Sequence, residues 1–127
     1  MLTRVDPEGR TFKESCALFL EADRCIRTTM HGRISDISVG PMTEAIDHLD
    51  VLFDHISTTW GVGSIPCNFA DRYARAQIYL NGMDSEIERL GPDHPLLETC
   101  VAMRAQVERL SRFCLKGVRD TMSLGSL

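Results

Sequence analysis

The segment from residue 41 to residue 60, PMTEAIDHLDVLFDHISTTW, constrains the fold more than any other part of this sequence. At 3.6 residues per helical turn, its large apolar residues fall within an arc of roughly 120°, the width expected of a helix that packs on a core. These residues are Met42, Ala45, Ile46, Leu49, Leu52, Phe53, Ile56 and Trp60. The pattern predicts a core helix, which needs other helices to cover its apolar face.

Three more segments, at about 12–30, 69–90 and 94–120, carry apolar residues at helical spacing. Thr11 and Glu14 form a capping box at the start of the first segment, and glycine or proline residues separate one segment from the next. The last two segments share a heptad period and a short connection, which favours an αα-hairpin. The sequence therefore predicts an all-α fold, a four-helix bundle that forms a single domain over residues 1–127.

Two residues inside these segments break the helical pattern. Asp23 interrupts the apolar stripe of the first helix, so we expect Arg27 or a neighbouring helix to pair with it. Gly82 lies in the middle of the third helix and costs about 1 kcal/mol relative to alanine, which suggests a close helix crossing or a bend.

The expected apolar stripe of the first helix contains Phe12, Cys16, Ala17, Phe19, Leu20, Ile26 and Met30.

The composition is that of an ordinary globular protein, with 43% hydrophobic and 25% charged residues. A formal net charge of −4 disfavours nucleic acid as a partner. We expect neither a signal peptide nor a membrane-spanning segment, because no apolar run is long enough. The five cysteines are scattered and form no Cys-x-x-Cys pair, so we expect a reducing cytoplasm and no disulfide framework.

Charge is segregated along the chain. Every charged residue between positions 34 and 71 is acidic, whereas the last helix carries a basic strip. This strip consists of Arg109, Arg112, Lys116 and Arg119. The two halves are predicted to pair within one chain, through the second and fourth helices, or across a dimer interface.

An acidic strip on the second helix is one candidate metal site. Asp47, Asp50 and Asp54 are spaced i, i+3 and i+7, so their carboxylates converge within about 10 Å, and oxygen ligands of this kind suit Mg²⁺. The alternative interpretation is a solvated helix face. The segment DHLDVLFDHI also resembles, over about ten residues, the second metal-binding helix of the all-α nucleotide pyrophosphatases of the MazG and dUTPase-like superfamily.

That resemblance implies that Asp47 and Asp50 are magnesium ligands in a nucleotide pyrophosphatase. The family also has a preceding helix with a Glu-x-x-Glu pattern. The first helix here offers instead Glu14 and Glu21, a full heptad apart. The resemblance therefore supplies one half of that metal site.

A second polar strip on the same helix contains Glu44, His48 and His55, which we consider possible metal ligands or a switch. Glu44 and His48 are one turn apart, but His55 is too far along the helix to share one ion with both. Another helix would have to complete such a site. The alternative interpretation places all three at the surface.

The sequence favours a non-enzymatic helical module, either an adaptor or a regulatory protein, that binds itself as a homodimer or binds another protein. No cofactor is expected. The alternative is the Mg²⁺-dependent, pyrophosphatase-like enzyme described above. A third hypothesis assigns the basic strip to a partner helix or an acidic surface, in which case association would be sensitive to salt.

Overall fold

The chain folds into four long α-helices in a computed structural model that describes residues 4–33 and 39–125. The helices are α1 (Phe12–Met30), α2 (Val39–Trp60), α3 (Phe69–Leu90) and α4 (Leu97–Gly125), and a short 3-10 helix, η2 (Val62–Ser64), follows α2. Within those ranges there is no strand. The predicted all-α class and the four-helix bundle are confirmed.

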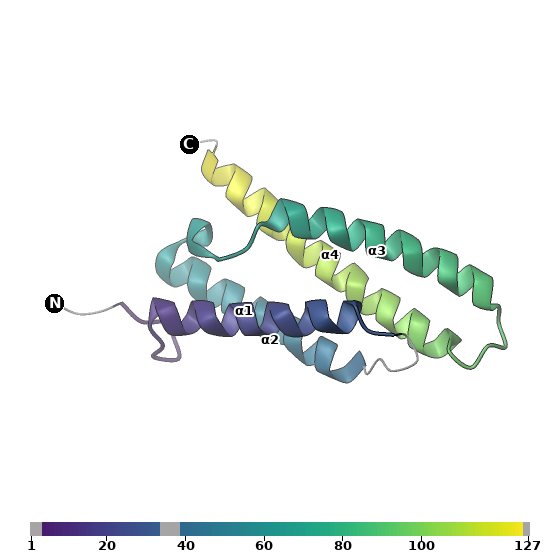
Figure 1. Ribbon diagram of the computed structural model, residues 1–127. Helices are drawn as coiled ribbons and strands as arrows, with labels where there is room; N and C mark the ends of the chain where they lie inside the picture. Colours follow the sequence, from purple (N-terminus) through teal and green to yellow (C-terminus); the bar gives the residue numbers. More distant parts are fainter. Residues whose placement is uncertain (1–3, 34–38, 126–127) are drawn as a thin grey trace.

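The helices form two antiparallel hairpins (Figure 1). Close backbone packing joins α1 to α2 and α3 to α4, and α2 packs on α4 between the two pairs. The predicted hairpin of the last two helices is confirmed. Because α2 and α4 make the central contact, α1 and α3 run in the same direction on the outside of the bundle, with their backbones further apart (Figure 1).

The predicted ends of α1 and α3 match the structure, and the predicted capping box is present. Thr11 Oγ1 accepts from the Glu14 amide at 3.2 Å, and Glu14 Oε1 accepts from the Thr11 amide at 3.1 Å. Helix α2 begins at Val39, ahead of the expected residue 41, so Pro41 still lies in the first turn. Helix α4 begins at Leu97 and not at residue 94, because the Leu96 amide donates to His94 Nδ1 in a preceding turn.

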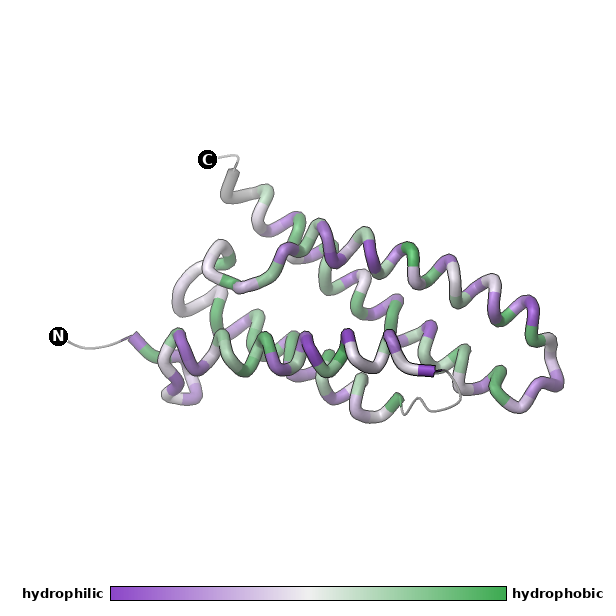
Figure 2. The backbone as a smooth tube through the Cα atoms, in the orientation of Figure 1, coloured by the Kyte–Doolittle hydropathy of each residue, from purple (hydrophilic) through white to green (hydrophobic). Residues whose placement is uncertain are grey.

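The core lies along α2 and between the two hairpins, and Figure 2 shows hydrophobic and hydrophilic residues alternating along each helix. Seven of the eight predicted core residues of α2 are buried, and Trp60 is half-buried beside Phe12. The heptad residues of α3 and α4 belong to the same core, in which Phe69, Ala76, Leu80, Met83, Cys100, Met103, Val107, Leu110 and Cys114 are buried and Tyr73, Ile87 and Leu90 are half-buried. The predicted apolar faces of these three helices are confirmed.

The predicted apolar stripe of α1 is partly wrong. Phe12 is 41% exposed and Leu20 is 48% exposed, and Ala17 is also exposed. The buried residues of α1 are Ser15, Phe19, Ala22 and Ile26. The helix is rotated relative to the prediction because Ser15 faces inward to bond a buried carboxylate, that of Asp6.

Of the two expectations at Gly82, a close helix crossing or a bend, the close crossing is wrong. Gly82 is exposed, and a Cβ atom built there meets no other atom. The close approach is at Gly117 of α4, where a Cβ would overlap the ring of Phe69. That ring is held edge-on against Phe53 and Phe113, with centroids 5.8 and 5.9 Å away. Gly117 therefore lets the end of α4 cross close to the start of α3.

No helix in the described ranges combines the length and the apolar character that crossing a lipid bilayer requires.

Candidate binding pocket

The acidic strip of α2 faces basic residues of α4. Arg109 Nη2 lies 2.5 Å from Asp47 Oδ1 and 2.9 Å from Asp50 Oδ2, and Lys116 Nζ lies 3.7 Å from Asp54 Oδ1. Hydrogen bonding to Asp47, and then to Asp50, raises the pKa of the Arg109 guanidinium. The predicted pairing of the second and fourth helices within one chain is confirmed. Because the three carboxylates are between 48% and 70% exposed, each pair contributes about 0–1 kcal/mol.

The carboxylates of the proposed metal site, Asp47, Asp50 and Asp54, are the ones that pair with Arg109 and Lys116. Among the residues that the structure describes, no group of three or more histidine, cysteine, aspartate or glutamate side chains is arranged to hold a metal ion. An ion at Asp47 and Asp50 would compete with Arg109 for the same oxygens. Of the two glutamates that the pyrophosphatase resemblance would use, Glu14 caps α1 and Glu21 is exposed. The magnesium site stays an alternative hypothesis.

The second polar strip does not converge on one point. Glu44 and His48 are exposed on α2, whereas His55 is half-buried further along the helix. His55 Nδ1 accepts a hydrogen bond from Arg10 Nη2 at 3.2 Å and lies 3.9 Å from a carboxylate oxygen of Asp6. Of the three predicted ligand or switch residues, His55 is the one that joins a polar network.

Asp6 is the centre of that network, and the sequence analysis missed it. Its buried carboxylate accepts from the backbone amides of Glu8 and Arg10, from Arg10 Nε at 2.9 Å and from Ser15 Oγ at 3.0 Å. Burial raises the pKa of Asp6, but these hydrogen bonds outweigh it and lower the pKa to about 2. The sequence signal was Asp-Pro-Glu-Gly, a turn in which an aspartate bonds its own following amides. The network anchors the segment before α1 to α1 and α2.

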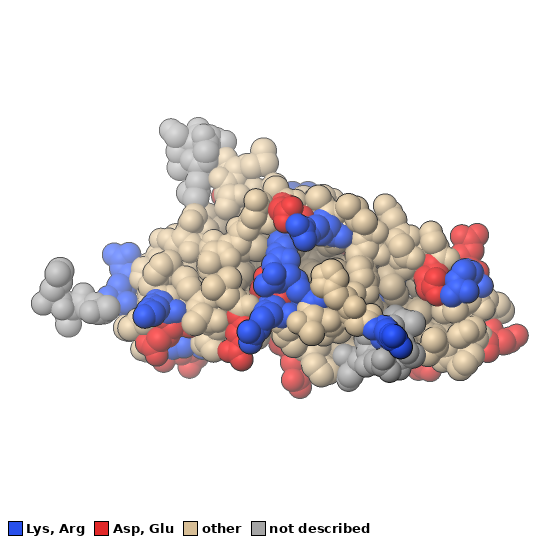
Figure 3. Space-filling view, viewed as in Figure 1, with Lys and Arg blue, Asp and Glu red and all other residues tan. Residues whose placement is uncertain are grey.

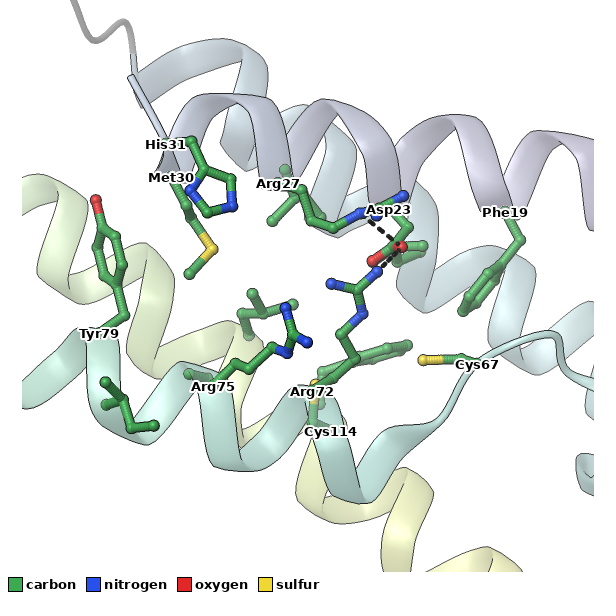
Figure 4. Close-up of a pocket in the computed structure, with 16 residues that line it drawn as sticks. Phe19, Asp23, Arg27, Met30, His31, Cys67, Arg72, Arg75, Tyr79 and Cys114 are labelled. Carbon is green, nitrogen blue, oxygen red and sulfur yellow. Dashed lines mark hydrogen bonds and ion pairs between the residues drawn. The ribbon is translucent and has the colours of Figure 1, made fainter. Parts of the chain in front are cut away.

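A cavity of about 220 Å³ opens between α1 and α3 (Figure 4). Its walls combine side chains of all four helices and of the segment before α3. The apolar floor consists of Phe19, Ile26, Leu49, Ala76, Leu110 and Phe113, and most of the other lining residues form a polar rim. Because side chains of all four helices enclose this cavity, it is our candidate functional site.

The cavity exists because α1 and α3 are joined by long side chains and not by close backbone packing. Asp23 of α1 accepts from Arg72 of α3, and its carboxylate lies 3.3 Å from Arg27 Nε (Figure 4). The Asp23 side chain is only 14% exposed. The prediction that Asp23 needs Arg27 or a neighbouring helix is confirmed, and the structure supplies both.

The rim of the cavity is cationic. Arg27, Arg72 and Arg75 line it, against the single lining carboxylate of Asp23. Arg75 Nε lies 3.1 Å from Asp71 Oδ2 one turn earlier in α3, in a pair that is largely exposed to solvent. Figure 3 shows Lys and Arg atoms in a band across this face, between α1 and α3. An anion approaching the cavity would meet these groups first.

The interior of the cavity is uncharged at neutral pH. Burial raises the pKa of the Cys67 thiol to about 11 and that of Cys114 to about 12, so both stay protonated. Burial also raises the pKa of the Tyr79 hydroxyl, which lines the cavity. All five cysteines are free thiols. The chemistry of the site is therefore that of a binding pocket with an apolar body and a charged mouth.

The fold and this site define an all-α protein with an apolar pocket between two hairpins and arginines at its mouth. Compared with protein-family models, with curated proteins and with solved structures, the chain has no match in any of the three.

Proposed function

We propose that this protein is a non-enzymatic regulatory module that binds a small molecule in the pocket between α1 and α3. The observation that supports this proposal is the position of the pocket, since its lining comes from both hairpins. An occupant would contact both hairpins at once. Its binding would therefore favour one distance between α1 and α3 over others, which is how a ligand shifts a conformational equilibrium.

A pocket-filling variant tests this function. Ala76 lines the floor and is 1% exposed, so Ala76→Leu would place a larger side chain in the cavity. The control is Ala105→Leu, at an exposed position of α4 that does not line the pocket. Both variants and the wild type would be melted with a panel of small organic acids, alcohols and amines.

A compound present at 100 times its Kd is expected to stabilise the wild type by about 2.7 kcal/mol. The same compound should stabilise Ala105→Leu equally and Ala76→Leu little or not at all. A panel in which no compound raises the melting temperature of the wild type would contradict the proposal. Equal stabilisation of all three proteins would place the binding site elsewhere.

Self-association is a second part of the proposal. The heptad positions of α3 and α4 are used inside the chain, so a homodimer would need other apolar side chains. Ile78 is 71% exposed and Val101 is 50% exposed. Light scattering at micromolar concentration tests this, and a strictly monomeric protein would remove the dimer. A cytoplasmic location fits five free thiols.

Binding of another protein through the basic strip also stays a proposal. Arg109 and Lys116 form ion pairs with α2. Arg112 is more available to a partner, because its side chain is 70% exposed and its ion pair with Glu108 is long, at 3.9 Å. A partner that uses this strip would dissociate as salt rises, because exposed charges are screened beyond about 10 Å at 0.1 M salt.

A further inference from the structure

The charges around the pocket leave room for one negative charge. Arg27, Arg72 and Arg75 line the pocket, while Asp23 lies between the first two and Asp71 lies beside the third. Three guanidinium groups therefore face two carboxylates. A ligand with a single negative charge would balance these five groups, whereas a neutral ligand would leave them with one net positive charge.

Arg75 is the arginine best placed to receive that charge. Arg27 and Arg72 both bind the half-buried Asp23, and this contact also joins α1 to α3. Arg75 binds only the exposed Asp71, and pairs of this kind are weak. In Figure 4 its guanidinium extends from α3 toward α1, beside the cavity. Its planar fork can donate two parallel hydrogen bonds to a carboxylate.

The rest of the pocket fits an apolar body. Its floor is aliphatic and aromatic, and the thiols of Cys67 and Cys114 add neutral, polarizable surface. The volume of about 220 Å³ exceeds that of an apolar cavity of roughly 150 Å³ that holds benzene. A chain or ring system somewhat larger than benzene would fill it.

We infer that the pocket binds a monocarboxylate with an apolar body, of the size of a medium-chain fatty acid, and that Arg75 binds its carboxylate. This inference rests on the proposed function, because it names the ligand class for the same pocket. The apolar body replaces water on the floor, and the carboxylate stays at the partly exposed mouth, where its desolvation is incomplete.

Three probes of similar shape test the charge. Octanoate, octan-1-ol and octylamine would be titrated into the full chain by calorimetry at low salt. Octanoate is expected to bind about tenfold more tightly than octan-1-ol. This is the gain in affinity expected from one charge-assisted hydrogen bond between a carboxylate and an arginine at a partly exposed site. Octylamine should bind more weakly than both.

Two variants that each lose one positive charge test the residue. Arg75→Gln should weaken octanoate about tenfold and leave octan-1-ol unchanged. The control Arg112→Gln removes an exposed arginine of α4 that does not line the pocket, so it should change neither affinity. Both positions are on helix surfaces, and their melting curves would verify that the variants fold. Ala76→Leu should weaken octanoate and octan-1-ol together.

The outcomes separate the ligand class from the function. Equal affinity for octanoate and octan-1-ol would overturn the carboxylate inference while supporting a pocket for neutral molecules. Equal losses of octanoate affinity in Arg75→Gln and Arg112→Gln would overturn the assignment of the carboxylate to Arg75. If none of the probes binds, the inference is overturned. The compound panel described above then decides separately whether the pocket binds small molecules at all.

Discussion

The contact between Gly117 and the ring of Phe69 predicts opposite effects for the same substitution at two glycines. Gly82 and Gly117 both lie inside long helices with negative φ, so alanine gains helix propensity at each. At Gly82 a Cβ meets open space, and Gly82→Ala should stabilise the fold by about 0.5–1 kcal/mol. At Gly117 the new Cβ would overlap Phe69.

The magnitude at Gly117 follows from how tightly that ring is held. Phe69 is 4% exposed and packs on Phe53 and Phe113, so it cannot turn away without disturbing both contacts. Overpacking of a core costs about 1–3 kcal/mol, and the severity of this overlap places it at the upper end. After a gain of about 1 kcal/mol from helix propensity, Gly117→Ala should lose about 2 kcal/mol.

Thermal and urea unfolding of the two variants would measure the difference. At roughly 4 °C per kcal/mol for a chain of this size, they should melt roughly 12 °C apart, on opposite sides of the wild type. Phe69→Leu provides the cross-check, because Gly117→Ala should be neutral or stabilising once the ring is gone. A Gly117→Ala protein as stable as the wild type would refute the close crossing of α4 and α3.

Four other predictions follow from groups outside the pocket or at its edge. The pKa of Asp6 is about 2 in the folded state, below 3.8, so its contribution of about 2 kcal/mol is present above pH 3.8 and is lost as the pH falls through 2. Urea unfolding between pH 2 and 5 should therefore show a steeper loss of stability in the wild type than in Asp6→Asn. Arg109→Ala should cost about 1 kcal/mol at low salt and less at 1 M salt, and a loss independent of salt would contradict an exposed ion pair. Mg²⁺ should leave the melting temperature unchanged, because the ion must displace Arg109; a stabilisation of about 2.7 kcal/mol at 100 times a Kd would support the metal site instead. Cys67 should react slowly with iodoacetamide at pH 8, since burial raises its pKa to about 11, and fast labelling mapped to Cys67 by mass spectrometry would show that the thiol is exposed.

The parts of the fold that the sequence predicted well are those in which one periodic pattern determines burial. The apolar face of α2 and the heptads of α3 and α4 each bury the residues that the spacing selects, because these helices are surrounded by other helices on that side. Helix α1 differs, since Ser15 is buried by a bond to Asp6, nine positions earlier in the chain. A period computed from hydrophobicity alone cannot place an inward-facing serine.

The candidate site was beyond prediction for a different reason. A pocket between α1 and α3 depends on which helix pairs pack closely and which stay apart, and local periodicity does not determine that choice. The one visible signal was Asp23, an acidic residue on an apolar stripe, which indicated a contact with another helix without identifying Arg72. The charge pairing of α2 with α4 was predictable, because opposite signs were segregated along the chain.

The order of the hairpins has a consequence for how quickly this chain acquires its structure. Each hairpin joins helices that follow one another in the sequence, and proteins dominated by such short-range contacts fold within microseconds to milliseconds. The two halves can then form early and meet through α2 and α4 in a later step. The cavity forms only when the two hairpins dock. A bound ligand would therefore stabilise the docked state, and it would slow the separation of the hairpins more than it speeds their formation.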